Sequence, residues 1–246
     1  SEKEMVFKRE KYLQRLLSRK GNGFVKIITG VRRCGKSYLL FKLFKKLLMK
    51  SGVTATQFIE IELDDDKNEN LRDPRKLSAY VRGKVRGKSA YYLFIDEIQF
   101  CRAVPLPDNP EEKLTFYDVL NGLMKIRNLD IYVTGSNSKM PSSEIFSEFR
   151  GCGNAICVHP LSFGEYLPAR GGDRRDVVKN YLLFGCMPCS VGSESDAVSQ
   201  GVVRGTEFEG CCRAQADSAD GRWRTCLLGK GSPCPRRLRR DIMGWK

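Results

Sequence analysis

The stretch KIITGVRRCGKSYLL, residues 26–40, decides how this chain folds. Its apolar half ends at Gly30, and two arginines, a cysteine and Gly-Lys-Ser follow. The apolar run predicts a short buried strand over Phe24–Thr29. The leucines beyond the loop recur at helical spacing and predict a helix over Lys36–Lys50. We therefore expect a strand, a glycine-containing basic loop and a helix in direct succession.

The loop fits the pattern G-x-x-x-x-G-K-S. Backbone N–H groups can approach a phosphate chain only where glycine leaves out a Cβ atom, and the N-terminus of the following helix favours the same anion. The pattern predicts an ATP phosphate cradle, with the lysine at the β- and γ-phosphates. The residues expected to bind the nucleotide are Gly30, Val31, Arg32, Arg33, Cys34, Gly35, Lys36, Ser37 and Tyr38.

A second phosphate-site element is expected at the end of YYLFID, residues 91–96. This nearly continuous apolar run is typical of a central strand in a parallel sheet. We expect Ser37 and Asp96 to hold Mg²⁺, and Glu97 to polarise a water molecule for attack on the γ-phosphate. Alone, the two acids could merely end a strand. Beside the cradle, the second carboxylate favours hydrolysis over phosphate binding alone. The similar letters at Arg86–Ser89 lack the first glycine and precede a strand, so we exclude them as a second cradle.

A third element is YVTGSN, residues 132–137. The end of this predicted strand places Thr134, Ser136 and Asn137 where a polar side chain could sense the γ-phosphate or the attacking water. A Gly-Ser-Asn turn needs no function by itself. Following a cradle and an acid-ended strand, it predicts that Ser136 and Asn137 act in catalysis with Lys36 and Glu97.

Strand and helix patterns alternate along the rest of the chain. This alternation predicts an α/β fold in which helices cover both faces of a parallel central sheet, with three layers over residues 24–160. The further elements are helices at Phe7–Lys20, from Asp73, near Phe116–Arg127, at residues 142–150 and at Asp173–Phe184, and strands at Thr56–Leu63, Asp130–Gly135 and Asn154–His159.

Five blocks together resemble a known family: ITGVRRCGKS, YLFIDEIQ, YVTGSNS, VHPLSFGEYL and YLLFGCMP. They resemble the prokaryotic AAA-type P-loop ATPases whose ATPase core precedes a C-terminal domain of unknown function. The resemblance covers about residues 5–188. It implies ATP with Mg²⁺ as cofactors. It also implies an ASCE-type sheet in which the sensor strand separates the acid strand from the cradle strand.

The chain departs from this family in two places. Gly151–Gly153 reads GCG where the family usually shows GRG, so Cys152 replaces an arginine that could serve as a sensor or finger. Arg150 is the substitute candidate for that catalytic role. Beyond Pro188 the resemblance ends, as after a reading-frame slip. Residues 189–246 contain only eight Ile, Leu or Val, too few to offset the ordering entropy. We expect an ATPase domain at 1–188 and a basic, disordered tail at 189–246.

Charge and cysteine usage limit the partners. The net charge is +14, and residues 1–50 hold 15 Lys/Arg against 3 Asp/Glu. Such a block suits nucleic acid or a nucleotide, although solvated helix faces explain it equally well. No long apolar run predicts a membrane span or a secretory segment, so a cytoplasmic protein without disulfides is expected. For Cys34, a lowered thiol pKa and a redox switch are a minor alternative. The CxxC spacing of Cys186 and Cys189 is read as coincidence.

Two function classes remain. The first is Mg²⁺-dependent ATP hydrolysis that drives a conformational change in DNA or a protein partner. The second is a nucleotide-binding switch with negligible turnover. Glu97 favours the first and Cys152 the second. A homo-oligomer is left open.

Overall fold

The computed structural model describes residues 7–136 and 154–184. Contacts divide the chain into two compact units. The first runs from Lys8 to Val158, and the chain from His159 onward belongs to the second. The predicted helix at residues 142–150 and the predicted tail at 189–246 lie outside the described residues.

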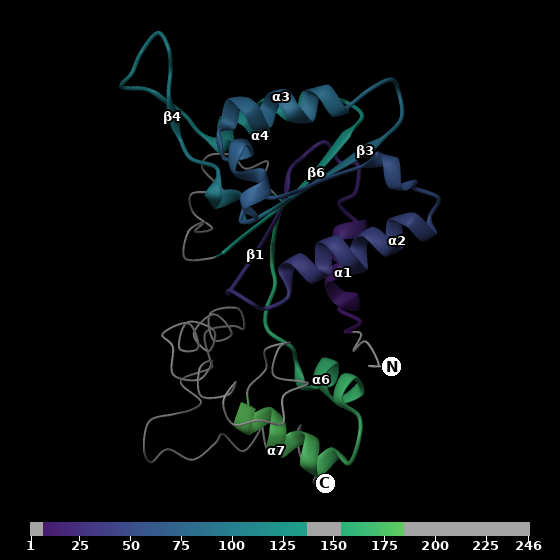
Figure 1. Cartoon of the computed structure of the whole chain (residues 1–246). Coiled ribbons are helices and arrows are strands. Elements are labelled where there is room, and N and C mark those ends of the chain that lie inside the picture. The colour runs from purple at the N-terminus through teal and green to yellow at the C-terminus, as the bar shows by residue number, and fades with distance from the viewer. Residues whose placement is uncertain (1–6, 137–153, 185–246) are drawn as a thin grey trace. The chain divides into compact units, whose positions relative to one another are not determined.

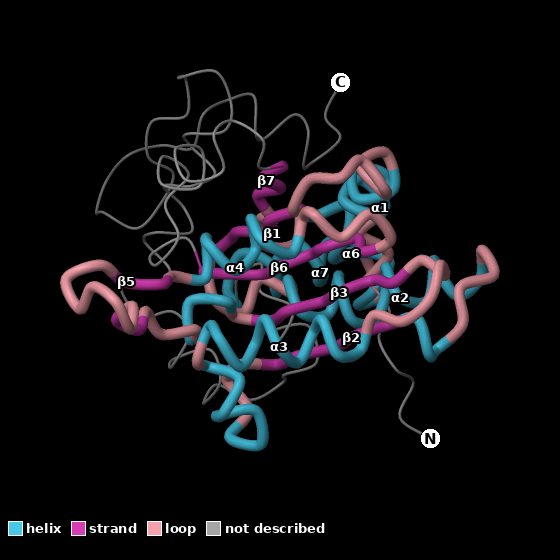
Figure 2. Tube along the Cα trace, turned by 90° about the horizontal axis from the view of Figure 1, so that it is seen from above, coloured by secondary structure: helices cyan, strands magenta, loops and turns pink. Residues whose placement is uncertain are grey.

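The first unit is built on a parallel five-stranded sheet, in which the strands lie side by side in the order β2-β3-β6-β1-β7 (Figure 2). The predicted α/β class is therefore confirmed. The implied order is confirmed as well, because β6 separates β1 from β3. The strands are β1 (Lys26–Gly30), β2 (Phe58–Glu62), β3 (Tyr91–Asp96), β6 (Leu129–Ser136) and β7 (Asn154–Cys157).

Helices cover both faces of this sheet (Figure 1). On one face, α1 (Glu10–Leu17) and α2 (Lys45–Lys50) form a core with alternate strand residues, including Phe94 and Tyr132. On the other, α3 (Pro74–Lys84) and α4 (Phe116–Leu123) pack on the intervening residues. Because both faces are covered, the inner strands β1, β3 and β6 are buried along almost their whole length, whereas β2 at the sheet edge alternates between buried and exposed residues.

Local sequence signals explain where several of these helices begin and end. The Asp73 side chain accepts a hydrogen bond from the Arg75 amide, and Pro74 opens α3, as expected for an N-cap followed by proline. The helix predicted after the loop is present over residues 36–50, with wide π-helical turns (η1) at Tyr38–Phe44.

The structure also contains elements that the sequence did not indicate. The segment between β3 and α4 forms a hairpin of β4 (Val104–Pro105) and β5 (Lys113–Leu114), which extends away from α4 in Figure 1. A hairpin this short has no detectable alternating pattern. The other additions are the 3₁₀ segments η2 (Ala55–Gln57), η3 (Asp66–Arg72) and η4 (Ile98–Phe100).

The described part of the second unit is a helical pair, α6 (Phe163–Arg170) and α7 (Arg174–Phe184). Helix α6 was not predicted, although Ser162 and Glu165 form a capping box at its start. The Tyr181 ring packs edge-on against Tyr166, and its hydroxyl donates to the Leu161 carbonyl at 2.8 Å. Within the described residues, no helix is long and apolar enough to cross a membrane.

A buried ion pair ties β1 to β6 near the ends where both strands begin. Lys26 is fully buried and its ammonium group donates to the Asp130 carboxylate. The same carboxylate accepts from the Tyr132 hydroxyl at 2.8 Å and from the Gly21 amide at 2.9 Å. Burial lowers the pKa of Lys26 despite the nearby carboxylate. The charge of Asp130 is thus fully engaged inside the protein.

This network generates a stability prediction. Lys26→Met should lower the free energy of unfolding by about 3–5 kcal/mol, because it leaves a buried carboxylate without its counter-charge. Lys26→Met combined with Asp130→Leu should recover much of that loss, since no unpaired charge remains. Urea titrations followed by circular dichroism measure both values. A double variant less stable than the single one would contradict this account.

Candidate functional site

The loop between β1 and the following helix is held in a shape that requires glycine. Gly30 has φ 151°, and a Cβ added there would lie 2.3 Å from the Val158 carbonyl oxygen and 2.9 Å from the Cys34 sulfur. Farther along, Arg33 with φ 62° and Gly35 with φ 95° take left-handed backbone conformations that turn the chain sharply. The predicted cradle therefore has the backbone that a glycine-dependent anion loop needs.

Lys36 closes the loop from its helical end. The side chain is 3% exposed, and its ammonium group donates to the carbonyl oxygens of Gly30 at 3.2 Å and Val31 at 3.1 Å. These two acceptors are neutral. The positive charge of Lys36 therefore lies inside the loop, where an anion would meet it directly.

Asp96, at the end of β3, joins two neighbouring elements. Its carboxylate accepts from the Ser37 hydroxyl at 2.7 Å and from the Thr134 hydroxyl on β6. Burial raises the pKa of Asp96, and the two hydrogen bonds partly oppose that rise. A hydroxyl and a carboxylate side by side are the oxygen donors that Mg²⁺ takes beside phosphate, so the residues fit this metal ion.

Glu97 follows with a left-handed backbone, φ 50°. Its amide donates to the Thr134 hydroxyl at 3.0 Å, and its carboxylate accepts from the Gln99 side-chain amide. The Gln99 carbonyl oxygen is buried and has no hydrogen-bond partner among the described residues. Glu97 is thus placed at the end of β3 beside Asp96, and Gln99 holds its carboxylate.

The structure assigns Thr134 a different position from the one expected and places Ser136 at the predicted strand end. Thr134 was expected to face the γ-phosphate or water, but it is fully buried and bonds Asp96 and Glu97. This expectation is wrong, because its side chain points to the neighbouring strand. Ser136 lies at the end of β6, in register with Gly30 of β1. The predicted residues Asn137, Arg150 and Cys152 lie outside the described residues.

The other predicted loop residues differ in exposure. Arg32 and Arg33 are exposed, whereas Val31 and Tyr38 are half-buried. Cys34 is buried, with its sulfur 3.3 Å from the Val158 carbonyl. Burial raises its pKa more than nearby Lys36 lowers it, so the alternative of a lowered thiol pKa is wrong.

Arg9 is a site-adjacent residue that the sequence reading missed. It is only 2% exposed, and its guanidinium donates to the Cys34 carbonyl, inside the loop, at 2.5 Å. The same group lies over the Tyr12 ring of α1, 5.3 Å from the centroid. The N-terminal helix is therefore attached to the phosphate-loop backbone. No motif signals this, because Arg9 is one of many basic residues in its segment.

Acidic residues surround the carboxyl ends of β2 and β3. Burial raises the pKa of Glu62, and the charge of nearby Asp96 raises it further, with smaller contributions from Asp64 and Asp65. Arg72 donates to the carbonyls of Leu63 and Asp64 and so fixes the turn that carries these acids. Bound cation would relieve the repulsion at this edge.

Comparison with known proteins places these features in a family. A family model described as an AAA domain matches residues 22–167. An uncharacterised protein of Haemophilus influenzae is 29% identical over 192 residues, which are 76% of this chain and 45% of that protein. An uncharacterised protein of Methanocaldococcus jannaschii is 31% identical over 143 residues, 58% of this chain and 28% of that one. The chain spans less than half the length of either relative.

Solved structures with a similar fold include AMPPCP-bound DnaA from Aquifex aeolicus, with a TM-score of 0.47 and 17% identity over 85% of this chain and 64% of that one. The Aeropyrum pernix ORC1 protein in complex with DNA gives a TM-score of 0.43 and 13% identity over 89% of this chain and 58% of that one. The match to the family model includes the phosphate loop, the acid strand and more than half of all residues. The chain therefore belongs to the AAA domain family.

Proposed function

We propose that the chain binds ATP with Mg²⁺ at the Gly30–Tyr38 loop, hydrolyses it, and uses the cycle to change the conformation of a nucleic-acid or protein partner. The observation that carries this proposal is the hydrogen bond from Ser37 to Asp96. It brings together the loop that suits phosphate and the carboxylate that suits a divalent cation. These groups come from two strands separated by a third.

The loop would bind the β- and γ-phosphates through its backbone N–H groups and Lys36. In the structure, the Lys36 ammonium is bonded to two loop carbonyls. A phosphate oxygen is a stronger acceptor than a neutral carbonyl, because the hydrogen bond is then charge-assisted. We expect the ammonium to exchange one carbonyl for phosphate without leaving the loop.

Ser37 and Asp96 would hold Mg²⁺, which when bound neutralises charge on the phosphate oxygens. Because burial raises the pKa of Asp96, a bound cation would also keep this carboxylate ionised. Thr134 would act through Asp96 and Glu97 and not on the nucleotide itself. Its hydroxyl donates to Asp96 and accepts from the Glu97 amide, so it sets the position of both residues.

Glu97 would orient and deprotonate the attacking water. Ser136 would contact the γ-phosphate; its place at the end of β6, in register with Gly30, supports this role. Asn137 and Arg150 stay candidates for sensing the phosphate and stabilising charge in the transition state. The division into a 1–188 ATPase domain and a tail also stays a prediction.

One observation favours the second candidate, a nucleotide-binding switch with slow turnover. The Gln99 amide occupies the Glu97 carboxylate. This contact engages one carboxylate oxygen and restrains the orientation of the side chain, so it would compete with an attacking water for that oxygen. The two candidates therefore differ in whether the Gln99–Glu97 contact opens when a partner binds.

The roles of Lys36 and Glu97 can be separated experimentally. Lys36→Ala should weaken ATP binding by about tenfold or more, because a charge-assisted hydrogen bond is lost. Glu97→Gln should retain binding and lower kcat by about 10²-fold or more, because only water activation is lost. Fluorescent-nucleotide titration and phosphate release measure the two effects. Equal losses of binding in both variants would contradict these roles.

Gln99→Ala tests which candidate function applies. If Gln99 restrains an active ATPase, the variant should release phosphate faster than the unaltered chain while its ATP affinity is unchanged. Phosphate release with and without DNA, in both proteins, measures this. Turnover that stays negligible in every combination would favour the switch and exclude hydrolysis as the function.

Arg9 should affect binding more than chemistry. Arg9→Met removes the donor to the Cys34 carbonyl, and we expect ATP affinity to fall by about tenfold, since a hydrogen bond from a charged group is lost. The kcat at saturating ATP should change little. Arg15→Met, at an exposed position of the same helix, is the matched control. An unchanged dissociation constant in Arg9→Met would show that the contact does not shape the loop.

A further inference from the structure

The edge of the sheet opposite the phosphate loop carries a concentration of positive charge. In a parallel sheet every strand begins at the same edge, so the connections that enter β1, β2, β3 and β6 meet there. These connections are residues 18–25, 50–57, 84–90 and 124–128, and none contains Asp or Glu. We call them the amino-edge surface. Its cations are Arg19, Lys20, Lys50, Lys84, Arg86, Lys88, Lys125 and Arg127.

Specific contacts hold these connections together. The Asn128 side chain donates to the carbonyls of Gly87 at 3.3 Å and Ser89 at 2.8 Å. The Gln57 side chain donates to Ala90 at 2.8 Å, and the Lys20 ammonium lies 5.7 Å from the centre of the Tyr92 ring of β3. The basic residues therefore lie on one braced surface, not on independent loops.

The charge of this surface is not neutralised internally. Among the described residues, none of its eight cations forms an ion pair. Other basic residues of the first fifty differ: Lys26 is paired with Asp130 and Lys45 with Glu60. Asp130, the one acid at the start of β6, already forms its buried ion pair with Lys26, so it does not neutralise the cations of the amino-edge surface. Part of the basic block read from the sequence is thus paired within the protein, and the amino-edge surface adds cations from two further segments, residues 84–90 and 124–128.

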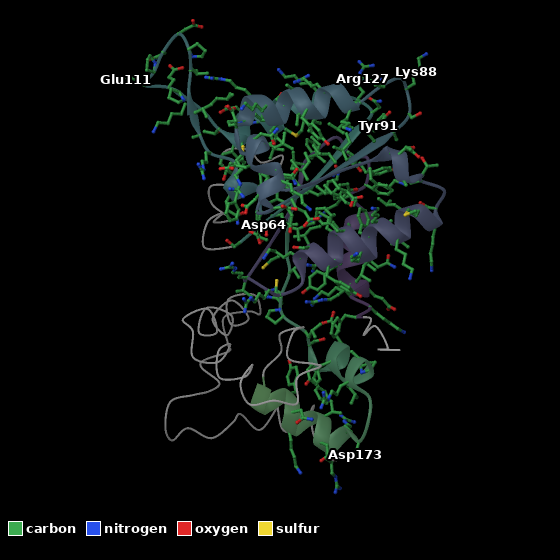
Figure 3. All side chains as sticks on the ribbon, viewed as in Figure 1. Asp64, Lys88, Tyr91, Glu111, Arg127 and Asp173 are labelled. Carbon is green, nitrogen blue, oxygen red and sulfur yellow. The ribbon has the colours of Figure 1, made fainter. Side chains whose placement is uncertain are left out.

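Helix stabilisation accounts for only part of this charge. Lys50 and Lys84 end α2 and α3, where a cation also favours the helix dipole. Arg86, Lys88 and Arg127 lie beyond the helix ends and are exposed. Figure 3 shows Lys88 and Arg127 at the same end of the strands as Tyr91, with Asp64 toward the other end.

We propose that the amino-edge surface binds the phosphate backbone of nucleic acid. This proposal deepens the proposed function, because it names the partner and the face that receives it. Basic loops that reach one surface from several segments suit a repeating anion, and such contacts carry no sequence preference. A lipid surface fits less well. Interfacial binding needs a substantial apolar face, and Phe24 is the only exposed large apolar side chain in these four described connections.

The placement has a functional consequence. The amino-edge surface and the phosphate loop lie at opposite ends of the same strands, because β1 begins at Lys26 and ends at Gly30. A nucleic acid bound at one end and ATP at the other would not compete for the same groups. Coupling between them would pass along β1 and β6, the strands joined by Lys26 and Asp130 at the basic end.

Charge reversal on the full 246-residue chain tests the proposal. The variant Arg86→Glu/Lys88→Glu/Arg127→Glu is compared with Lys11→Glu/Lys42→Glu/Lys113→Glu, which reverses three exposed cations elsewhere in the same unit. Fluorescence anisotropy measures binding to a labelled single strand and its duplex across a salt series. Titration with a fluorescent ATP analogue and thermal melting are run on both variants.

We expect the amino-edge variant to lose about tenfold or more in affinity for both probes. The slope of log Kobs against log salt should flatten by about 2–3, because up to three phosphate contacts are removed. The control should lose much less affinity, and both variants should bind the ATP analogue as the unaltered chain does. Equal losses in both triple variants, or no binding of either probe by the unaltered chain, would overturn the proposal.

Vesicles containing phosphatidylserine form a separate arm. Amino-edge-dependent binding to vesicles without binding to nucleic acid would identify a lipid surface and overturn the proposal. Failure of the unaltered chain to bind ATP would instead contradict the proposed function. The proposal about nucleic acid would then still be decided by the charge-reversal comparison.

Discussion

The site depends on the two hydrogen bonds that the Asp96 carboxylate accepts. One comes from Ser37, on the first turn after the phosphate loop, and the other from Thr134 on the intervening strand. Burying a carboxylate costs free energy unless the group accepts hydrogen bonds. The two bonds to Asp96 therefore hold the ends of β3 and β6 and the phosphate loop next to one another. The helix dipole, the lysine and the acids then face one region without any long loop to place them.

A second set of polar contacts between strands lies at the other end of the same strands. The Lys26–Asp130 pair joins β1 to β6 where both begin, as Ser37, Asp96 and Thr134 join β1, β6 and β3 where they end. A one-residue slip of a strand exchanges its two faces. Both sets of polar contacts would break in such a slip, although the apolar residues of these strands would stay buried on either face. Polar groups thus fix a register that continuous hydrophobic strands leave ambiguous.

The sequence predicted what local chemistry controls. Gly30, Lys36 and Asp96 belong to patterns whose spacing is set by a single loop or strand, and they lie where expected. Arg9 and Gln99 were missed because their contacts depend on how distant segments meet, which periodicity does not report. Thr134 was found but misread, since its pattern shows that it ends a strand and not which way its hydroxyl points. Asn137 and Arg150 lie outside the described residues.

The close approach at Gly30 brings the phosphate loop into contact with the last residue of the first unit. The Val158 carbonyl occupies the space where a Cβ of residue 30 would lie and accepts the Cys34 thiol, and the Val158 amide donates to Thr29 at 2.7 Å. Val158 is also the last residue of the first unit. A shift of the loop backbone at Gly30 would therefore change the contacts that hold Val158 within the first unit. Because Gly30 has no side chain, the backbone of the loop and the backbone of Val158 are in direct contact, with no side chain between them to absorb a displacement.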